Sequence, residues 1–317
     1  MNLLPMLLAL TAAAPGAVSS SDIAASGPRG DLKGTLVTVA GSTQPPVLIL
    51  PGSGPTDRDG NSPLGLKGST YRLLAEGLAQ QGIPSTRIDK RGSFASAGAV
   101  ADRSELTLPG YVQDTRAWIA ATRAKTGATC VWLLGHSEGG LVALQTAADS
   151  PKDICGLILV STAGRPLEQV LKQQLRANPA NAPLLPDADR AIDTLSAGRR
   201  VDPATLPPPL AGLFRSEVQP LWISELAVDP IALIGRLKLP VLIMQGEKDL
   251  QVSVEDARRL KEGQPAARLT LLPDANHVLK SVASEERSAN FATYADPNLP
   301  LAPHIVEGIA AFITAKR

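Results

Sequence analysis

The chain has 317 residues, and its 31 Lys and Arg against 30 Asp and Glu give a formal net charge of +1. A charge so near zero creates no strong field to attract nucleic acid or an anionic membrane. Apolar residues make up 44% and charged residues 19%, which is typical of a folded globular protein and excludes wholesale disorder. No apolar run reaches the roughly 18 residues of a transmembrane helix. Three His and two Cys are too few for a zinc cluster or a disulfide framework.

The first residues predict export. An apolar stretch at residues 3–10 leads into small residues, and residues 17–19 offer a small-x-small cleavage site. We interpret residues 1–21 as a signal peptide and expect a periplasmic or secreted protein. The stretch lacks Lys and Arg, so a misplaced start codon or a frayed N-terminal tail is the alternative.

Further along the chain, short and nearly continuous apolar runs alternate with segments of helical periodicity. Such runs are typical of parallel strands buried on both faces. The expected strands are residues 34–39, 47–50, 85–88, 130–134, 156–160, 241–244 and 269–272. The expected helices are residues 71–81, 111–125, 138–149, 254–261 and 305–315. This alternation predicts an α/β fold with a mostly parallel, doubly wound sheet.

One interval, residues 163–239, has no strand pattern and is rich in Pro. So long a segment is not a bare loop inside a compact domain, and apolar pairs between the prolines favour short helices. We predict a helical cap at 163–239, inserted into a core formed by residues 22–162 and 240–317. Cys130 and Cys155 precede two expected neighbouring strands. A disulfide is one alternative there, and we favour two buried free thiols.

The most informative short pattern is Gly-His-Ser-Glu-Gly at residues 135–139, between an apolar strand and a helix of small residues. A serine in so sharp a strand-to-helix turn is strained and exposes its hydroxyl above the sheet edge. Glycines two residues before and after it are needed because a Cβ there would collide with the reversed chain. We therefore interpret Ser137 as a nucleophile.

A serine nucleophile needs a general base, and the chain offers three His. His277 follows the strand at 269–272, at the carboxyl edge where α/β sheets gather their ligands, and it is our candidate base. Strand alternation turns the side chain of His136 away from that of Ser137, so a structural role is expected for it. His304 begins the last helix, where a surface or capping role is expected.

The base needs a carboxylate that fixes its tautomer and stabilises the imidazolium ion. Asp249 follows the strand at 241–244 and is the candidate, whereas Glu247, two positions earlier in the chain, is expected to point elsewhere. The order Ser, Asp, His along the chain is that of α/β-hydrolases. We expect backbone N–H groups of Glu138 and Ser53 to form an oxyanion hole. Side chains and backbone fill every role, so no cofactor and no metal are expected.

Residues 56–61, Thr-Asp-Arg-Asp-Gly-Asn, superficially suggest a calcium loop. Ser62 stands where a calcium loop needs Gly, and Gly68 stands where it needs a ligating Glu, so calcium is disfavoured. We interpret the segment as an ion-paired rim beside the cleft, with a contact from Arg58 to a polar group of the substrate as an alternative. Residues 89–92, Asp-Lys-Arg-Gly, are expected to form a structural loop with paired charges.

These motifs together resemble the α/β-hydrolase superfamily, in its serine aminopeptidase-like and esterase/lipase-like branch. The matching segments are residues 51–61, 89–92, 135–139, 246–249 and 276–277. The resemblance implies an α/β-hydrolase fold, a Ser137, His277 and Asp249 triad, the same oxyanion hole and a cap. The chain departs from its relatives at Pro51, where they usually have His, and at Phe94, where they often have a second glycine.

The favoured function is hydrolysis of small-molecule carboxylic esters through an acyl-enzyme. Aliphatic cap residues and Trp222 suggest an aliphatic acyl site for small or medium groups. Cleavage of peptides or amides by the same triad is the alternative, and Glu217, Glu225 and Asp229 in the cap are its candidate anchors for a substrate amine. A non-catalytic binding protein is disfavoured by the complete triad. The sequence leaves the oligomeric state open.

Overall fold

The computed structural model describes residues 16–284 and 286–315. One eight-stranded sheet with the order β1-β2-β4-β3-β5-β6-β7-β8 forms its centre. The strands are β1 (Val18–Ser26), β2 (Asp31–Val39), β3 (Val47–Leu50), β4 (Ser85–Ile88), β5 (Val131–His136), β6 (Ile154–Val160), β7 (Val241–Gly246) and β8 (Arg268–Leu272). β2 pairs antiparallel with β1 and β4, and the pairs among β3 to β8 are parallel. The predicted mostly parallel α/β sheet is confirmed.

Helices cover both faces of the sheet, because successive side chains of its buried strands point to opposite faces. Leu48 and Leu50 of β3 pack with one set of helices, α2 (Leu108–Thr126), α3 (Glu138–Asp149), α8 (Pro230–Ile234) and α9 (Val254–Gly263). Val47 and Ile49 face the other set, α1 (Thr70–Gln80) and α11 (Ile305–Thr314). The expected strands and helices are all present, with ends that differ by three residues at most. Among the described helices, none has the length and apolar character to cross a bilayer.

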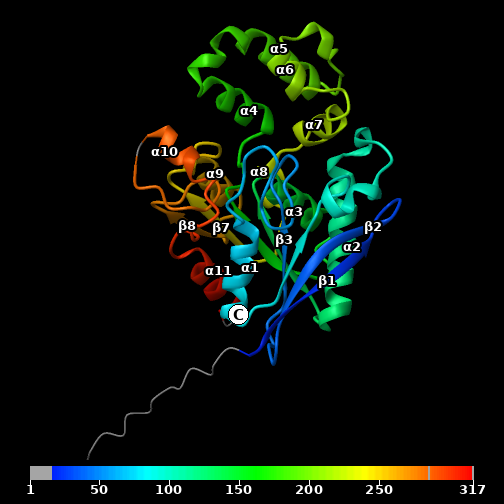
Figure 1. Cartoon of the computed structure of the whole chain (residues 1–317), viewed down its shortest axis with the longest axis vertical. Helices are drawn as coiled ribbons and strands as arrows, with labels where there is room; N and C mark the ends of the chain where they lie inside the picture. The colour runs from blue at the N-terminus through cyan, green and yellow to red at the C-terminus, as the bar shows by residue number, and fades with distance from the viewer. Residues whose placement is uncertain (1–15, 285, 316–317) are drawn as a thin grey trace, which may run out of the picture.

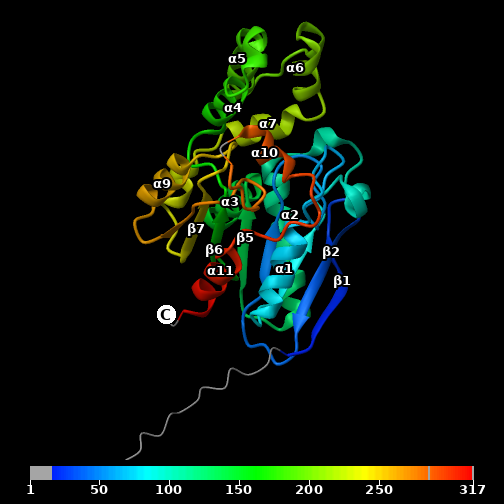
Figure 2. The ribbon, with the colours of Figure 1, turned by 60° about the vertical axis from the view of Figure 1, so that its left-hand side comes forward.

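Between β6 and β7 the chain forms a group of short helices with an apolar core of its own. They are α4 (Leu167–Arg176), α5 (Leu185–Ser196), α6 (Pro208–Leu213), α7 (Gln219–Leu226) and α8, with the 3-10 turns η3 (Pro179–Leu184) and η4 (Pro203–Thr205). Ile192, Leu195 and Phe214 are fully buried in this separate core. Both views place α4 to α7 together at one end of the molecule, beyond the sheet (Figures 1 and 2). Helix α8 packs on α3 and α9 instead. We refer to residues 163–239 as the helical segment, and its limits as a separate domain remain a prediction.

Four elements were not expected from the sequence: β1, α10 (Arg287–Ala292) and the 3-10 turns η1 (Phe94–Ala99) and η2 (Arg103–Glu105). β1 is an edge strand in which Ile23 and Ala25 alone are buried, so it lacks the apolar run of an inner strand. Its first residues overlap the predicted cleavage site at 17–19. Residues 1–15 of the predicted signal peptide lie outside the described residues.

Cys130 and Cys155 form a disulfide, and the expectation of two free thiols was wrong. The register that pairs Val131 of β5 with Ile154 of β6 brings the two Cys to a Cα separation of 5.2 Å, within the range that a disulfide requires. The sequence placed the two residues on neighbouring strands but did not give this register. The bond lies at the amino end of the two strands, opposite the edge that carries Ser137.

Candidate active site

Ser137 lies in a strained turn between β5 and α3, with φ 54° and ψ −119°. A Cβ at Gly135 would meet the backbone of Gly139, and a Cβ at Gly139 would meet the backbone of Leu50. Both glycines are therefore required by the close approach of the chain, as the sequence predicted. The N–H of Ser137 donates to the carbonyl oxygen of Val160, 2.9 Å away on β6, and this bond anchors the turn to the sheet.

His277 and Asp249 are brought together from the loops that follow β8 and β7. Nδ1 of His277 lies 2.8 Å from Oδ2 of Asp249, whose side chain is fully buried. Because a carboxylate only accepts hydrogen bonds, Nδ1 donates to it, and in the neutral ring Nε2 then keeps its lone pair. A neutral imidazole with a free Nε2 is the form that can accept a proton from an alcohol.

Several donors keep Asp249 ionised. Its Oδ1 accepts from the N–H groups of Gln251, at 2.7 Å, and Val252, at 2.9 Å, and its Oδ2 also accepts from Nε2 of Gln245, at 3.2 Å. Burial alone would raise the pKa of Asp249. The attraction of His277 and the hydrogen bonds that the carboxylate accepts outweigh burial, and they hold its pKa below the ordinary value. The group therefore stays charged beside the imidazole.

Two cavities meet at Ser137. The smaller, of about 80 Å³, is lined by Ser137, His277 and Ser53 among others. The larger, of about 430 Å³, is lined by Ser137, Ser53 and Glu138 and extends into the helical segment. Its walls there are mainly apolar, formed by Leu167, Val170, Leu171, Leu175, Leu213, Trp222, Val228 and Pro230. Within the described residues, the backbone N–H groups of Ser53 and Glu138 have no hydrogen-bond acceptor. The structure thus brings together all the predicted site residues except Arg58.

Arg58 is held away from both cavities by Asp89. Its Nη2 and Nε lie 2.7 and 3.1 Å from Oδ2 of Asp89, and its backbone N–H donates to Oδ1 at 2.9 Å. Asp59 forms an ion pair with Arg87, and Oδ1 of Asp57 accepts backbone N–H groups of its own loop. These contacts confirm an ion-paired rim. They give Arg58 a structural partner, and it is not among the described residues that line the cavities.

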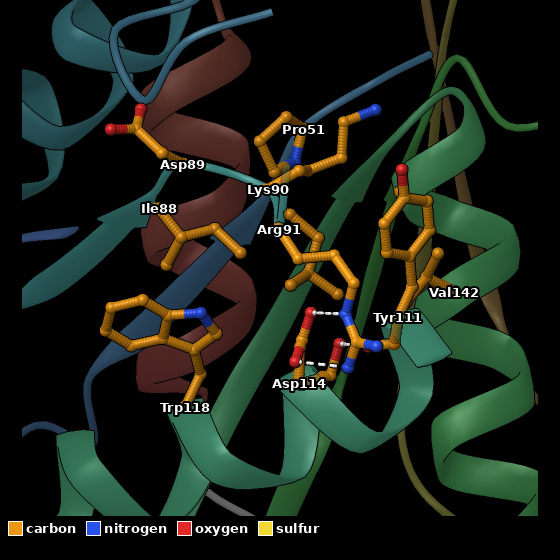
Figure 3. Close-up of a pocket in the computed structure, with 12 residues that line it drawn as sticks. Pro51, Ile88, Asp89, Lys90, Arg91, Tyr111, Asp114, Trp118 and Val142 are labelled. Atoms are coloured by element: carbon orange, nitrogen blue, oxygen red, sulfur yellow. Dashed lines mark hydrogen bonds and ion pairs between the residues drawn. The ribbon is translucent and has the colours of Figure 1, made fainter. Parts of the chain in front are cut away.

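The loop after β4 is also held by paired charges, as expected. Arg91 turns toward α2 and binds Asp114 through Nε and Nη2, at 2.5 and 2.6 Å, whereas Asp89 points the other way (Figure 3). Trp118 and Tyr111 line the same small buried space of about 20 Å³, which is too small for a substrate. Phe94 adopts a φ of 47°, in the region that favours glycine, so the departure from the family pattern costs local strain.

Lys90 connects this loop with the site. Its Nζ donates to the carbonyl oxygen of Gly52 at 2.7 Å and to Oε1 of Glu138 at 2.9 Å, and all three groups are nearly buried. Glu225 of α7 lines the large cavity near Glu138, and its Oε1 is buried with no hydrogen-bond partner in the described part of the chain. Burial, followed by the negative charge of Glu138, raises the pKa of Glu225 well above its ordinary value. Folding therefore favours the protonated form of the Glu225 carboxyl.

The other two His residues have structural positions. His136 is buried behind Ser137, where its Nδ1 lies 2.9 Å from the hydroxyl of Tyr71 and its Nε2 lies 2.7 Å from the carbonyl oxygen of His277. His304 is exposed at the start of α11. Both placements agree with the sequence-based expectation. No group of three or more His, Cys, Asp or Glu within residues 16–284 and 286–315 is placed to hold a metal ion.

Sequence reasoning missed several residues that shape the site. Tyr71 and Gln245 lie on elements whose periodicity indicates only a helix or a buried strand. Nothing in the local pattern shows which way these polar groups turn. Asn290 of the unexpected α10 accepts from Nδ2 of Asn276 and donates to the carbonyl oxygen of Lys248, at 3.2 and 2.7 Å. It thereby connects the loops that carry Asp249 and His277.

Comparison with known proteins finds similarity to hydrolases. The model of the family described as serine aminopeptidase, S33, matches residues 64–207, which is less than half of the chain. Esterase EstD of Thermotoga maritima is 28% identical over 84% of this chain and 61% of its own length. Lipase 1 of Psychrobacter immobilis is 25% identical over 54% of this chain and 57% of its own length, so the chain spans about three fifths of the length of these two relatives.

Solved structures share the α/β-hydrolase fold. An esterase of Pyrococcus furiosus superposes with a TM-score of 0.57 at 18% identity, covering 83% of this chain and 84% of that one. An enol-lactonase of Burkholderia xenovorans superposes with a TM-score of 0.55 at 19% identity, covering 92% of this chain and the whole of that one. At these identities the likeness concerns the fold alone.

Proposed function

We propose that this α/β-hydrolase cleaves carboxylic esters through an acyl-enzyme formed on Ser137. The supporting observation is the convergence of Ser137, in a strained strand-to-helix turn, and His277, bound at 2.8 Å to a buried Asp249, on one cavity. The similarity to an esterase and to lipases supports the same class of substrate.

In the proposed mechanism, Oγ of Ser137 attacks the ester carbonyl carbon while Nε2 of His277 takes its proton. Asp249 stabilises the resulting imidazolium ion. The N–H groups of Ser53 and Glu138, which have no acceptor in the described structure, bind the oxyanion. His277 then protonates the leaving alcohol, and a water molecule activated by the same imidazole hydrolyses the acyl-enzyme and restores Ser137.

The large cavity supports an acyl group of small or medium size. Its volume of about 430 Å³ and its mainly aliphatic walls suit an unbranched or lightly branched chain better than a charged one. Trp222 forms part of this wall, in agreement with its predicted substrate contact. The acyl chain would lie against residues of the helical segment, and the ester group would lie at the strand edges.

The charges in the helical segment favour esters over amino-terminal peptides. A peptide amine needs an ionised carboxylate, and only Glu225 of the three predicted anchors lines the large cavity. Its raised pKa favours the protonated form, which cannot pair with an ammonium group. Asp229 caps α8, where its Oδ1 accepts from the N–H of Ile231 at 2.9 Å, and Glu217 is paired with Arg215 on the surface. Aminopeptidase or amidase activity therefore remains the second choice.

We also propose that the protein is exported to the periplasm or the medium. The Cys130–Cys155 disulfide suits an oxidising compartment, as does the predicted signal at 1–21. N-terminal sequencing of the protein from the cell envelope or medium tests this proposal. A mature end near Ser20 is expected, whereas an intact Met1 in the cytoplasm would contradict it.

The reaction is tested with p-nitrophenyl esters of graded acyl length and with aminoacyl anilides. We expect the short and medium esters to react faster than every anilide. Ser137→Ala should lower ester turnover by about 10⁴-fold or more, because the nucleophile is removed. His304→Ala removes a histidine far from the predicted reaction and should change turnover less than twofold. Faster cleavage of anilides would show that amides, rather than esters, are the substrate class. Activity of Ser137→Ala within tenfold of wild type would exclude Ser137 as the nucleophile.

A further inference from the structure

A chain of three buried hydrogen bonds joins the loop after β3 to the loop after β8. The N–H of Gly52 lies 2.8 Å from the hydroxyl oxygen of Tyr71, and that hydroxyl lies 2.9 Å from Nδ1 of His136. Nε2 of His136 lies 2.7 Å from the carbonyl oxygen of His277. Tyr71 is 3%, His136 5% and His277 6% exposed, so water does not compete for these bonds.

The donor at one end, the N–H of Gly52, and the acceptor at the other, the carbonyl oxygen of His277, fix the direction of every bond in this chain. The carbonyl oxygen of His277 can only accept, so Nε2 of His136 donates to it. Burial lowers the pKa of His136 to about 3, with a further contribution from His277, so the ring is neutral and Nδ1 is an acceptor. Tyr71 must then donate to Nδ1, which leaves its oxygen to accept the N–H of Gly52. Each polar atom thus has one role, and no alternative orientation satisfies all of them.

The two ends of this hydrogen-bond chain adjoin the two groups that the proposed reaction needs at fixed positions. Gly52 precedes Ser53, a proposed oxyanion donor, and its carbonyl oxygen is bound at 2.7 Å by Lys90. His277 carries the proposed base, and its ring is 4.9 Å from that of His136 between centroids. The side chain of His277 is oriented by Asp249, and its backbone is oriented by His136.

We propose that Tyr71 and His136 are positioning residues that hold the oxyanion loop and the base in one fixed arrangement around Ser137. Both line the smaller cavity beside Ser137, but their polar atoms are already engaged in these three hydrogen bonds. Both act through their neighbours, Tyr71 through Gly52 and His136 through His277. This inference rests on the proposed function, because it assigns a role in the reaction proposed for Ser137.

The expected effect is on the rate of the chemical step rather than on binding. A shift of about 1 Å in a catalytic group can cost about 10²-fold in rate. Tyr71→Phe removes the hydroxyl and leaves two groups, the N–H of Gly52 and Nδ1 of His136, without partners. We expect kcat to fall by about 10- to 100-fold, whereas KM, which reflects contacts in the large cavity, should change less than threefold.

The matched control is Tyr111→Phe, which removes one hydroxyl from another buried tyrosine, on α2. It should change kcat less than twofold.

A second pair of variants tests His136: His136→Gln keeps one donor and one acceptor, and His136→Leu keeps neither. His136→Gln should retain at least threefold more of kcat than His136→Leu. The double variant Tyr71→Phe with His136→Leu should lower kcat little more than the more damaging single variant does, because both substitutions break the same chain of hydrogen bonds.

The measurement is kcat and KM on the best p-nitrophenyl ester, with thermal melting to compare folded stability. A fall in kcat at unchanged KM for Tyr71→Phe, partial rescue by His136→Gln and a sub-multiplicative double variant support the inference. Tyr71→Phe with kcat within threefold of wild type, or equal losses in His136→Gln and His136→Leu, would overturn it. Wild-type protein that neither cleaves the esters nor reacts with a fluorophosphonate would instead overturn the proposed function.

Discussion

The strand-edge loops and the helical segment differ in how fully their buried polar groups are hydrogen-bonded. At the strand edges, the carboxylate of Asp249 accepts four hydrogen bonds, and His136 and His277 are held by directional contacts of 2.7 to 2.9 Å. In the helical segment, the cavity wall is mainly aliphatic, and Glu225 keeps one buried oxygen without a partner in the described structure.

This difference separates two tasks. Directional bonds fix atoms to within a fraction of an ångström, which a chemical step requires. Apolar walls select substrates by volume, since hydrophobic contact has no preferred direction. We therefore expect substitutions at the strand edges to change kcat by orders of magnitude. Substitutions in the helical segment should change the preference among substrates by smaller factors.

The largest expected effect comes from Asp249→Asn. The amide cannot stabilise an imidazolium ion, and its NH₂ group favours the wrong tautomer of His277. We expect kcat to fall by about 10⁴-fold with little change in KM, measured on the best ester. Glu247→Gln, which neutralises an exposed carboxylate two residues away, is the control and should leave kcat unchanged. An Asp249→Asn protein that keeps a tenth of the wild-type activity would show that strand-edge substitutions do not have the larger effect on kcat that we expect of them.

The next effect is a change in chain-length preference for Trp222→Ala. The smaller side chain lengthens the large cavity, and each additional buried methylene contributes about 0.8 kcal/mol. Two more methylenes should therefore raise kcat/KM for longer esters, relative to short ones, by about tenfold. Ile223→Ala, on the same helix but not among the residues lining the cavity, should leave the ratio unchanged. An unchanged ratio in Trp222→Ala would show that the helical segment does not determine which ester is preferred.

The smallest kinetic effect is expected for Glu225→Gln, because glutamine has the shape of the neutral acid. We expect kcat and KM within about threefold of wild type at pH 7. The effect appears instead in stability. Since the pKa of Glu225 is raised by folding, the folded chain holds a proton that the unfolded chain releases above the ordinary pKa of a carboxyl. The free energy of unfolding of wild type therefore falls as pH rises, and this contribution is absent from the variant.

Chemical denaturation between pH 5 and 9 measures this difference. The stability of Glu225→Gln relative to wild type should increase with pH. Glu217→Gln, at an exposed and paired position of the same segment, is the control and should show no such trend. Parallel pH profiles for Glu225→Gln and wild type would mean that Glu225 is ionised, and an ammonium-bearing substrate would then become the better candidate.

The sequence predicted the strand edges better than the contacts behind them. Continuous apolar runs marked the inner strands, and the glycines around Ser137 marked a turn that only close backbone approach can explain. The loops after β7 and β8 then gave Asp249 and His277, because parallel strands bring their carboxyl ends to one edge. Strand alternation also placed His136 behind Ser137.

The remaining contacts depend on how distant elements are rotated and registered. Tyr71 reaches His136 only because α1 lies on the sheet at one particular rotation, and helical periodicity gives its buried face but not the end of its side chain. The pairing of Cys130 with Cys155 depends on the register of β5 and β6. Arg58 had an equally good polar partner in a loop 31 residues away, and no local pattern favoured Asp89 over a substrate.

The proposed reaction requires Ser137 to be the nucleophile. Incubation with a fluorophosphonate, followed by digestion and mass spectrometry, tests this most directly. We predict one adduct per chain, on the peptide that contains Ser137, with loss of ester turnover in proportion to labelling. Ester turnover that persists after complete labelling of Ser137, or an adduct on another residue that abolishes it, would contradict the account.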